Sequence, residues 1–203
     1  MTQSVLREDR VLSVVRADVI PDAVALCDAL VAGGIRTVEL TFTTPDVLSH
    51  LAAAAGAGHA VGVGTVRTGD QARAAIDAGA TFLVTPGISP EIAGIAAARG
   101  IPFYLGAFTA TEVMTALDLG STAVKIFPAR ALGPGYLRDL RGPFPSAELL
   151  PSGGIDESNA AAYLAAGAVA VCAGTGVVPP ATVAAGDWTA ITERAASFVA
   201  HLS

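Results

Sequence analysis

Short apolar segments rich in Val, Ile and Leu alternate along the chain with longer, Ala-rich segments of helical character. Most of the short segments are apolar at nearly every position, which is typical of strands covered by helices on one face and by core on the other. Eight strands are predicted, at Val11–Ala17, Thr37–Phe42, His59–Val66, Phe82–Gly87, Pro102–Phe108, Ala123–Ala129, Glu148–Gly154 and Val169–Gly176.

The intervening segments predict helices whose ends carry recognisable signals. Pro21 and Asp22 open the first helix, because proline is favoured in a first turn, and Gly33-Gly34 ends it. A second helix is predicted between Asp46 and Gly56. The others are predicted at Asp70–Ala78, Glu91–Arg99, Glu112–Leu119, Glu157–Ala166 and Trp188–Leu202.

Eight strands that alternate with helices in 203 residues predict a (β/α)8 TIM barrel, an α/β fold that forms a single domain over residues 1–203. The alternative is an open doubly wound sheet. That fold would place a glycine fingerprint after its first strand, where this chain has Arg16-Ala17-Asp18. The pattern therefore favours the barrel.

Charge and composition narrow the class of protein further. A net charge of −6 argues against nucleic acid or an anionic membrane as a partner. The longest uncharged stretch, residues 158–186, is mostly Ala and Gly and is interrupted by Pro179-Pro180, so we interpret it as buried structure rather than a membrane span. Neither Cys27 nor Cys172 has metal-ligand spacing. We expect a cytoplasmic protein.

Active sites of barrels lie where the strands end, so polar residues there are the candidates for chemistry. Lys125 is the only lysine in the chain, and it is flanked by Val124 and Ile126 inside a predicted strand. One interpretation is a lysine that extends from the strand edge to solvent. The other is a desolvated amine, which is the nucleophile required for a Schiff base with a ketone.

Glu39 is the matching acid, because it lies within the apolar run Val38-Glu39-Leu40. Alternation along the strand places Thr41 and Thr43 on the same face as Glu39. Glu39 is either a structural partner of a nearby cation or a general acid and base with a raised pKa.

Two glycine-rich turns follow the last two predicted strands, at Ser152-Gly153-Gly154 and Gly174-Thr175-Gly176. Backbone N–H groups at these positions commonly bind phosphate in barrels. The three histidines, His50, His59 and His201, lie away from the catalytic strand ends, so no metal site is expected.

Several of these segments resemble one known family, the 2-keto-3-deoxy-6-phosphogluconate / 4-hydroxy-2-oxoglutarate aldolases. The resemblance covers nearly the whole chain, with the motifs in the family's order. The motifs are residues 33–46 (GGIRTVELTFTTPD), 63–66 (VGTV), 84–87 (VTPG), 125–128 (KIFP), 142–145 (GPFP) and 151–155 (PSGGI).

The resemblance implies a class I aldolase on a barrel, usually trimeric, that cleaves a phosphorylated keto sugar acid to pyruvate and glyceraldehyde 3-phosphate without a cofactor. Lys125 matches the imine-forming lysine and Glu39 the proton-relaying glutamate. The implied substrate-binding residues are Arg16, Thr43, Thr65, Pro86, Phe127, Gly153, Gly154, Gly174 and Thr175.

The chain also departs from the family pattern. Thr43 stands where many members have Arg, Leu105 precedes Gly106 where Pro is common, and Ser152 stands where Thr is common. Residues 127–134 also resemble the 6-phosphogalactonate branch, so the C4 configuration of the substrate stays open. A non-catalytic barrel that binds a phosphorylated metabolite is a further alternative, and histidine placement disfavours a metal-dependent epimerase.

Overall fold

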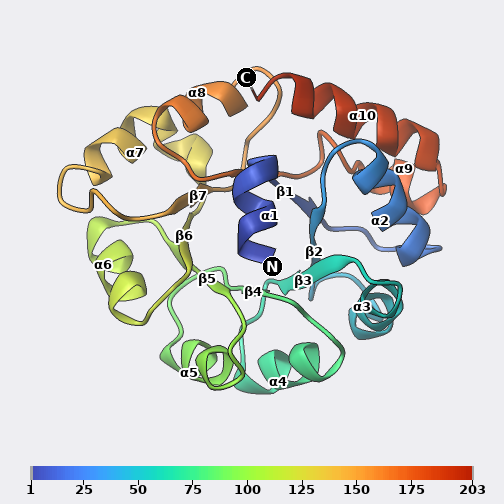
Figure 1. The fold of residues 1–203 in the computed structure, drawn as a ribbon, viewed down its shortest axis with the longest axis horizontal. Helices are drawn as coiled ribbons and strands as arrows, with labels where there is room; N and C mark the ends of the chain where they lie inside the picture. Colours follow the sequence, from blue (N-terminus) through green and yellow to red (C-terminus); the bar gives the residue numbers. More distant parts are fainter. Residues whose placement is uncertain (1, 203) are drawn as a thin grey trace.

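The computed structural model describes residues 2–202, whose parallel strands form a nearly closed barrel inside a ring of helices (Figure 1). The predicted (β/α)8 fold is therefore confirmed. β1 pairs with both β2 and β8. β7 meets the segment that leads into β8 through a single bridge, between Leu149 and Ala168. The strands are β1 (Val11–Val15), β2 (Thr37–Thr41), β3 (Ala60–Gly64), β4 (Leu83–Val84), β5 (Phe103–Ala107), β6 (Ala123–Ile126), β7 (Leu149–Pro151) and β8 (Val171–Ala173).

Helices follow the strands in sequence and pack on the outside of the barrel, except for α1. No helix within residues 2–202 is both long and apolar enough to cross a bilayer. The helices are α1 (Thr2–Asp9), α2 (Ala23–Ala32), α3 (Val47–Gly56), α4 (Gly69–Asp77), α5 (Pro90–Ala98), α6 (Ala110–Asp118), the 3-10 helix η1 (Ala129–Ala131), α7 (Gly133–Leu140), α8 (Ala160–Ala165), α9 (Pro180–Ala184) and α10 (Trp188–Ala200).

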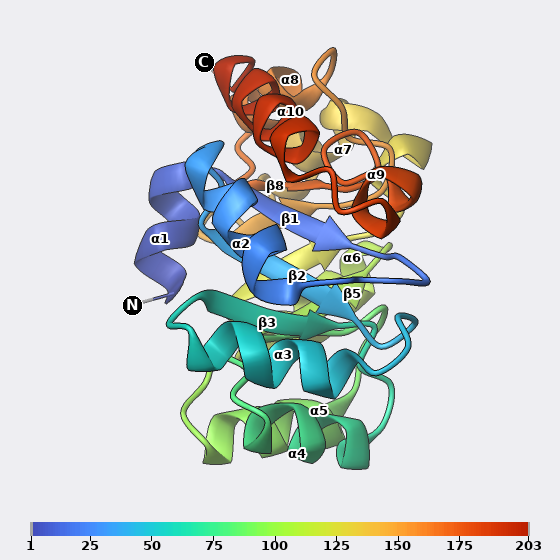
Figure 2. The ribbon, with the colours of Figure 1, turned by 90° about the vertical axis from the view of Figure 1, so that its right-hand side faces the viewer.

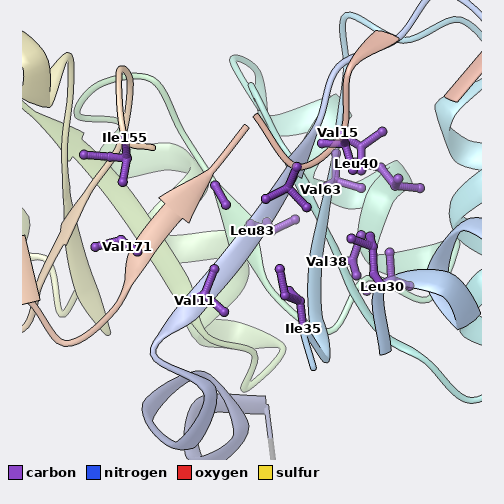
Figure 3. Packing of buried hydrophobic residues seen from close by; sticks show 14 of the residues in the cluster. Val11, Val15, Leu30, Ile35, Val38, Leu40, Val63, Leu83, Ile155 and Val171 are labelled. Atoms are coloured by element: carbon purple, nitrogen blue, oxygen red, sulfur yellow. The ribbon is translucent and has the colours of Figure 1, made fainter. Parts of the chain in front are cut away.

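Side chains alternate between two separate cores, as the two-residue period of a strand requires. On β2, Val38 and Leu40 belong to the large core between the barrel and its helices (Figure 3). Glu39, between them in the strand, lies instead against Gly64 inside the barrel. The interior itself holds a smaller apolar cluster that includes Leu12, Phe82 and Tyr104.

Helix α1 covers the end of the barrel where the strands begin (Figure 2). Leu6 on this helix is buried and joins the interior cluster. Arg7 pairs with Glu148, and Arg36 pairs with Glu8 and Asp9, so ion pairs attach α1 to the barrel at several points. The other end of the barrel is left free for a site.

The observed elements differ from the predicted ones mainly in length. Every strand is shorter, and β4 is reduced to two residues because the chain bends at Pro86 and Gly87, where the Thr85 hydroxyl donates to the carbonyl of Gly87. The strand predicted to continue to Ala129 ends at Ile126, and η1 follows it. The helix predicted at Glu157–Ala166 begins only at Ala160. Sequence reasoning did not predict α1, η1, α7 or α9.

Candidate active site

A cavity of about 520 Å³ opens where the strands end. The strand ends lie on the side of the barrel opposite α1 (Figure 2). The cavity is bounded mainly by β1, β6, β7 and β8 and by the loops that follow them. Its lining residues are Val14, Arg16, Lys125, Phe127, Arg130, Ser152, Gly153, Gly154, Ile155, Asp156, Cys172, Gly174, Thr175 and Gly176. Seven of the site residues predicted from the sequence therefore lie together in this cavity: Arg16, Lys125, Phe127, Gly153, Gly154, Gly174 and Thr175.

Lys125 lies in β6 and is only 7% exposed, so its side chain does not extend from the strand edge into solvent. Its Nζ lies 5.5 Å from the centroid of the Phe127 ring. In the β5–β6 register Lys125 lies opposite Gly106. A Cβ at Gly106 would come within 2.4 Å of the Pro86 carbonyl oxygen, so glycine is required for β5 to approach the end of β4.

Pro86, which was expected to bind substrate, is not among the residues that line this cavity. Its main chain packs against Gly106, directly beside Lys125 in the sheet. The geometry thus gives Pro86 a place in the wall that supports β5, rather than a surface on the cavity.

Glu39 is 1% exposed and lies inside the barrel against Gly64. A Cβ at Gly64 would lie 1.7 Å from Glu39 Oε1, so this glycine makes room for the carboxylate. Burial raises the pKa of Glu39, and the nearby Lys125 and Arg16 oppose that rise only in part. A carboxyl group with a raised pKa can hold a proton near neutral pH and pass it on.

The Glu39 carboxylate has no fixed partner among the described residues. Both of its oxygens are buried without a hydrogen bond, and no ion pair within 4.0 Å joins it to Lys125 or Arg16. A purely structural glutamate would be expected to satisfy its oxygens. The geometry favours a group that changes partners during a reaction.

Arg16 extends from the end of β1 into the cavity and is held by two threonines. Its guanidinium donates to Thr43 Oγ1 at 2.6 Å and to Thr65 Oγ1 at 3.3 Å. Thr41 and Thr43 are linked through their hydroxyls at 2.9 Å. Thr43 and Thr65 were expected to contact substrate, but neither threonine lines the cavity, whereas Arg16 does. The two threonines are thus placed to orient this arginine.

The glycine turn after β7 presents unpaired donors. The carbonyls of Gly153 and Gly154 accept from the Arg130 backbone N–H and from Asn159 Nδ2, each at 3.0 Å. Within residues 2–202, the N–H groups of Gly153, Gly154 and Ile155 donate to no protein acceptor. Gly153 and Gly154 both have positive φ, at +90° and +81°, which glycine adopts without strain. A turn with this arrangement is suited to an anion.

Three lining residues that carry polar groups were missed by sequence reasoning: Arg130, Asp156 and Cys172. Burial raises the pKa of Cys172 to about 12, so its thiol is neutral and does not compete with Lys125 as a nucleophile. The two-residue alternation of β8 places Cys172 on the same face as Gly174, and this could have indicated its position. Arg130 and Asp156 lie on turns beyond their strands, where no periodicity predicts direction.

Metal ligation finds no support in the described part of the chain. No group of three His, Cys, Asp or Glu side chains in residues 2–202 comes together as a metal site would require. His59 lies near the start of β3 and contacts Asp28 through Nε2 at 3.1 Å, and His201 caps α10.

Comparison with known proteins agrees with this geometry. The family model "KDPG and KHG aldolase" matches residues 2–194. A 2-dehydro-3-deoxy-phosphogluconate aldolase of Treponema pallidum is 39% identical over 92% of this chain and 90% of its own. The KHG/KDPG aldolase of Escherichia coli K12 is 34% identical over 95% and 92%.

A solved structure shows the same arrangement of the chain. It is the KDPG aldolase of Legionella pneumophila, with pyruvate captured as a covalent carbinolamine intermediate. It is 31% identical, covers 97% of both chains and superposes with a TM-score of 0.89. This protein therefore belongs to the KDPG and KHG aldolase family.

Proposed function

We propose that this protein is a class I aldolase, a carbon–carbon lyase that reversibly cleaves 2-keto-3-deoxy-6-phosphogluconate to pyruvate and glyceraldehyde 3-phosphate. The same chemistry extends to 4-hydroxy-2-oxoglutarate, which would give pyruvate and glyoxylate. The observation that carries the proposal is a single lysine, Lys125, 7% exposed and inside a cavity next to the buried Glu39.

In the first stage Lys125 Nζ attacks the C2 ketone of the substrate. The carbinolamine that forms loses water and leaves a protonated imine. This iminium accepts the electron pair of the C3–C4 bond as that bond breaks, while the C4 hydroxyl loses its proton and becomes the aldehyde. The enamine is then protonated at C3, and water hydrolyses the resulting imine to release pyruvate and regenerate the amine.

Each of these stages moves a proton, and we assign the relay to Glu39. It accepts the proton of the C4 hydroxyl and returns a proton to C3, directly or through water. The raised pKa of its carboxyl group and its two unpaired oxygens support this role, since a group fixed in an ion pair exchanges protons less readily.

The two ends of the substrate are assigned to opposite parts of the site. Arg16, oriented by Thr43 and Thr65, binds the carboxylate of the pyruvate half, and Phe127 covers the imine. The phosphate is bound at the other end by backbone N–H groups. The residues proposed there are Gly153, Gly154, Gly174 and Thr175.

The decisive experiment traps the imine. The protein is incubated with pyruvate, reduced with borohydride and digested, and the adduct is located by peptide mass. We expect one adduct, on Lys125, which is the only lysine in the chain. Absence of an adduct, or an adduct only on the N-terminal amine, would refute the aldolase and leave the barrel as a binding protein.

Further features of the protein are proposed on the same basis. Residues 1–203 form one aldolase domain, and three copies assemble into a homotrimer in the cytoplasm, without a cofactor. Both cysteines are unpaired and buried, which fits a reducing compartment. Light scattering tests the trimer, and full turnover after exhaustive chelation tests the independence from metal.

A further inference from the structure

Arg130 is a cation of the cavity to which neither the motifs nor the mechanism above gives a role. It lies on η1, the 3-10 helix immediately after β6, and its side chain is exposed to the cavity. Within the described residues its guanidinium makes no ion pair and no hydrogen bond. An arginine in a cavity without a protein partner is available to a ligand.

The backbone holds Arg130 directly over the glycine turn. Its N–H donates to the Gly153 carbonyl at 3.0 Å, and the preceding Ala129 N–H donates to the Ser152 carbonyl at 2.8 Å. A Cβ at Gly154 would lie 2.5 Å from Arg130 Cβ and 2.9 Å from its Cδ. The side-chain stem therefore lies across Gly154, beside the N–H groups that have no protein acceptor.

The charges around the cavity indicate that the ligand is anionic at more than one point. Three cations line it, Arg16, Lys125 and Arg130, in a chain whose net charge is −6. The one carboxylate in the lining is Asp156, whose Oδ1 already accepts from the backbone N–H and hydroxyl of Ser158. This concentration of positive charge attracts an anionic substrate against the net charge of the protein.

We propose that Arg130 binds the phosphate group of the substrate and makes the phosphorylated sugar acid the preferred substrate over 4-hydroxy-2-oxoglutarate. This inference rests on the proposed function. A phosphate has three terminal oxygens, which match the planar donor fork of one arginine together with the backbone donors of the glycine turn. A carboxylate has two oxygens and would leave part of this donor set unused.

The test compares the two substrates in three variants. Arg130→Met keeps a stem over Gly154 and removes the charge, whereas Arg130→Lys restores the charge without the fork. The matched control is Arg138→Met, an exposed arginine of α7 that lies outside the cavity lining. Thermal unfolding of all three variants reports whether the fold is intact.

We expect Arg130→Met to raise KM for 2-keto-3-deoxy-6-phosphogluconate roughly 10- to 100-fold, the size of one charged hydrogen-bond set, with little change in kcat. Both constants for 4-hydroxy-2-oxoglutarate stay at wild-type values. Arg130→Lys recovers part of the loss, and Arg138→Met behaves as wild type. An unchanged KM, or an equal loss on both substrates, would overturn the proposal.

A binding experiment separates this proposal from the aldolase function itself. Inorganic phosphate is titrated into each protein and its binding is followed by phosphorus NMR. Weaker binding by Arg130→Met than by Arg138→Met supports the phosphate role, even if the wild type fails to trap pyruvate. Equal binding by the two variants refutes the phosphate role, even if the wild type is an active aldolase.

Discussion

The two ends of the barrel are built from the same eight strands but carry different kinds of residue, apolar at one end and charged or glycine-rich at the other. At the end where strands begin, Leu6 of α1 closes the opening over an apolar interior. Phe82 and Tyr104 fill the space behind it, with ring centroids 5.6 Å apart. At the end where strands finish, charged side chains and glycine turns surround a cavity.

Glu39 and Lys125 lie at the boundary between these regions, where the requirements of stability and of activity differ. The closed end gains stability from buried apolar area. The open end keeps a buried carboxylate without hydrogen bonds, which lowers stability and provides a group able to exchange protons. The comparison therefore predicts that mutations at the open end lower activity without lowering stability, and that mutations at the closed end lower stability.

The largest effect on activity is expected for Lys125→Arg. A guanidinium remains charged and cannot form the imine. Cleavage therefore falls to the assay background, and borohydride traps no adduct at position 125. Positive charge is kept, so binding of substrate analogues and the thermal midpoint change little. Residual cleavage above background with the mutant would mean that the reaction does not pass through Lys125.

Glu39→Gln is expected to reduce turnover about 10²- to 10⁴-fold, the usual contribution of general acid–base catalysis. The amide keeps the shape of the side chain but cannot exchange a proton. Exchange of the pyruvate methyl protons with deuterated water, followed by NMR, isolates the enamine step. Exchange and cleavage at wild-type rates would show that Glu39 is only structural.

Glu39→Gln also tests whether the buried carboxylate lowers stability, through the pH dependence of the free energy of unfolding. The pKa of Glu39 is raised above its ordinary value of 4.5 in the folded protein, so the folded state disfavours the ionised form. The stability of the wild type contributed by this group is full below pH 4.5 and is lost as pH rises. Glu39→Gln is therefore expected to be more stable than wild type, by a margin that grows from acidic to neutral pH in chemical denaturation.

At the closed end, Leu6→Ala is expected to lower the free energy of unfolding by about 2–5 kcal/mol, because it leaves a cavity under α1. Well below the unfolding temperature, kcat and KM remain at wild-type values. Val31→Ala, at a side chain that is 40% exposed, is the control and changes neither. A loss of kcat in folded Leu6→Ala would show that the two ends are coupled.

The open end was largely predictable from sequence, whereas the closed end was not. Lys125 and Glu39 are charges inside apolar runs, and such an interruption is a strong signal on its own. Helix α1 carries no comparable signal, because its one deeply buried apolar residue is Leu6 and its attachment depends on distant partners such as Glu148. Tertiary contacts of this kind leave no local pattern.

Two features of the chain after β6 were also beyond sequence reasoning. Gly133-Pro134-Gly135 is typical of a loop, yet it opens α7, whose Leu137 and Leu140 are buried against the core. The chain between β6 and this helix folds into η1, and only that turn places Arg130 over Gly154. The sequence shows that residue 130 is an arginine, but the direction of the Arg130 side chain depends on the conformation of η1.

The smallest effect is expected for Thr43→Val, which removes the hydroxyl that accepts from Arg16 at 2.6 Å and keeps the side-chain shape. Thr43 is a positioning residue, so we expect KM to rise roughly 2- to 10-fold while kcat is unchanged. Arg16→Met alone should cost more, because it removes the charge itself. In the double variant, Thr43→Val should add nothing to Arg16→Met, since the threonine acts only through the arginine. Additive losses in this cycle would mean that Thr43 contacts substrate directly, as the resemblance to the family first implied.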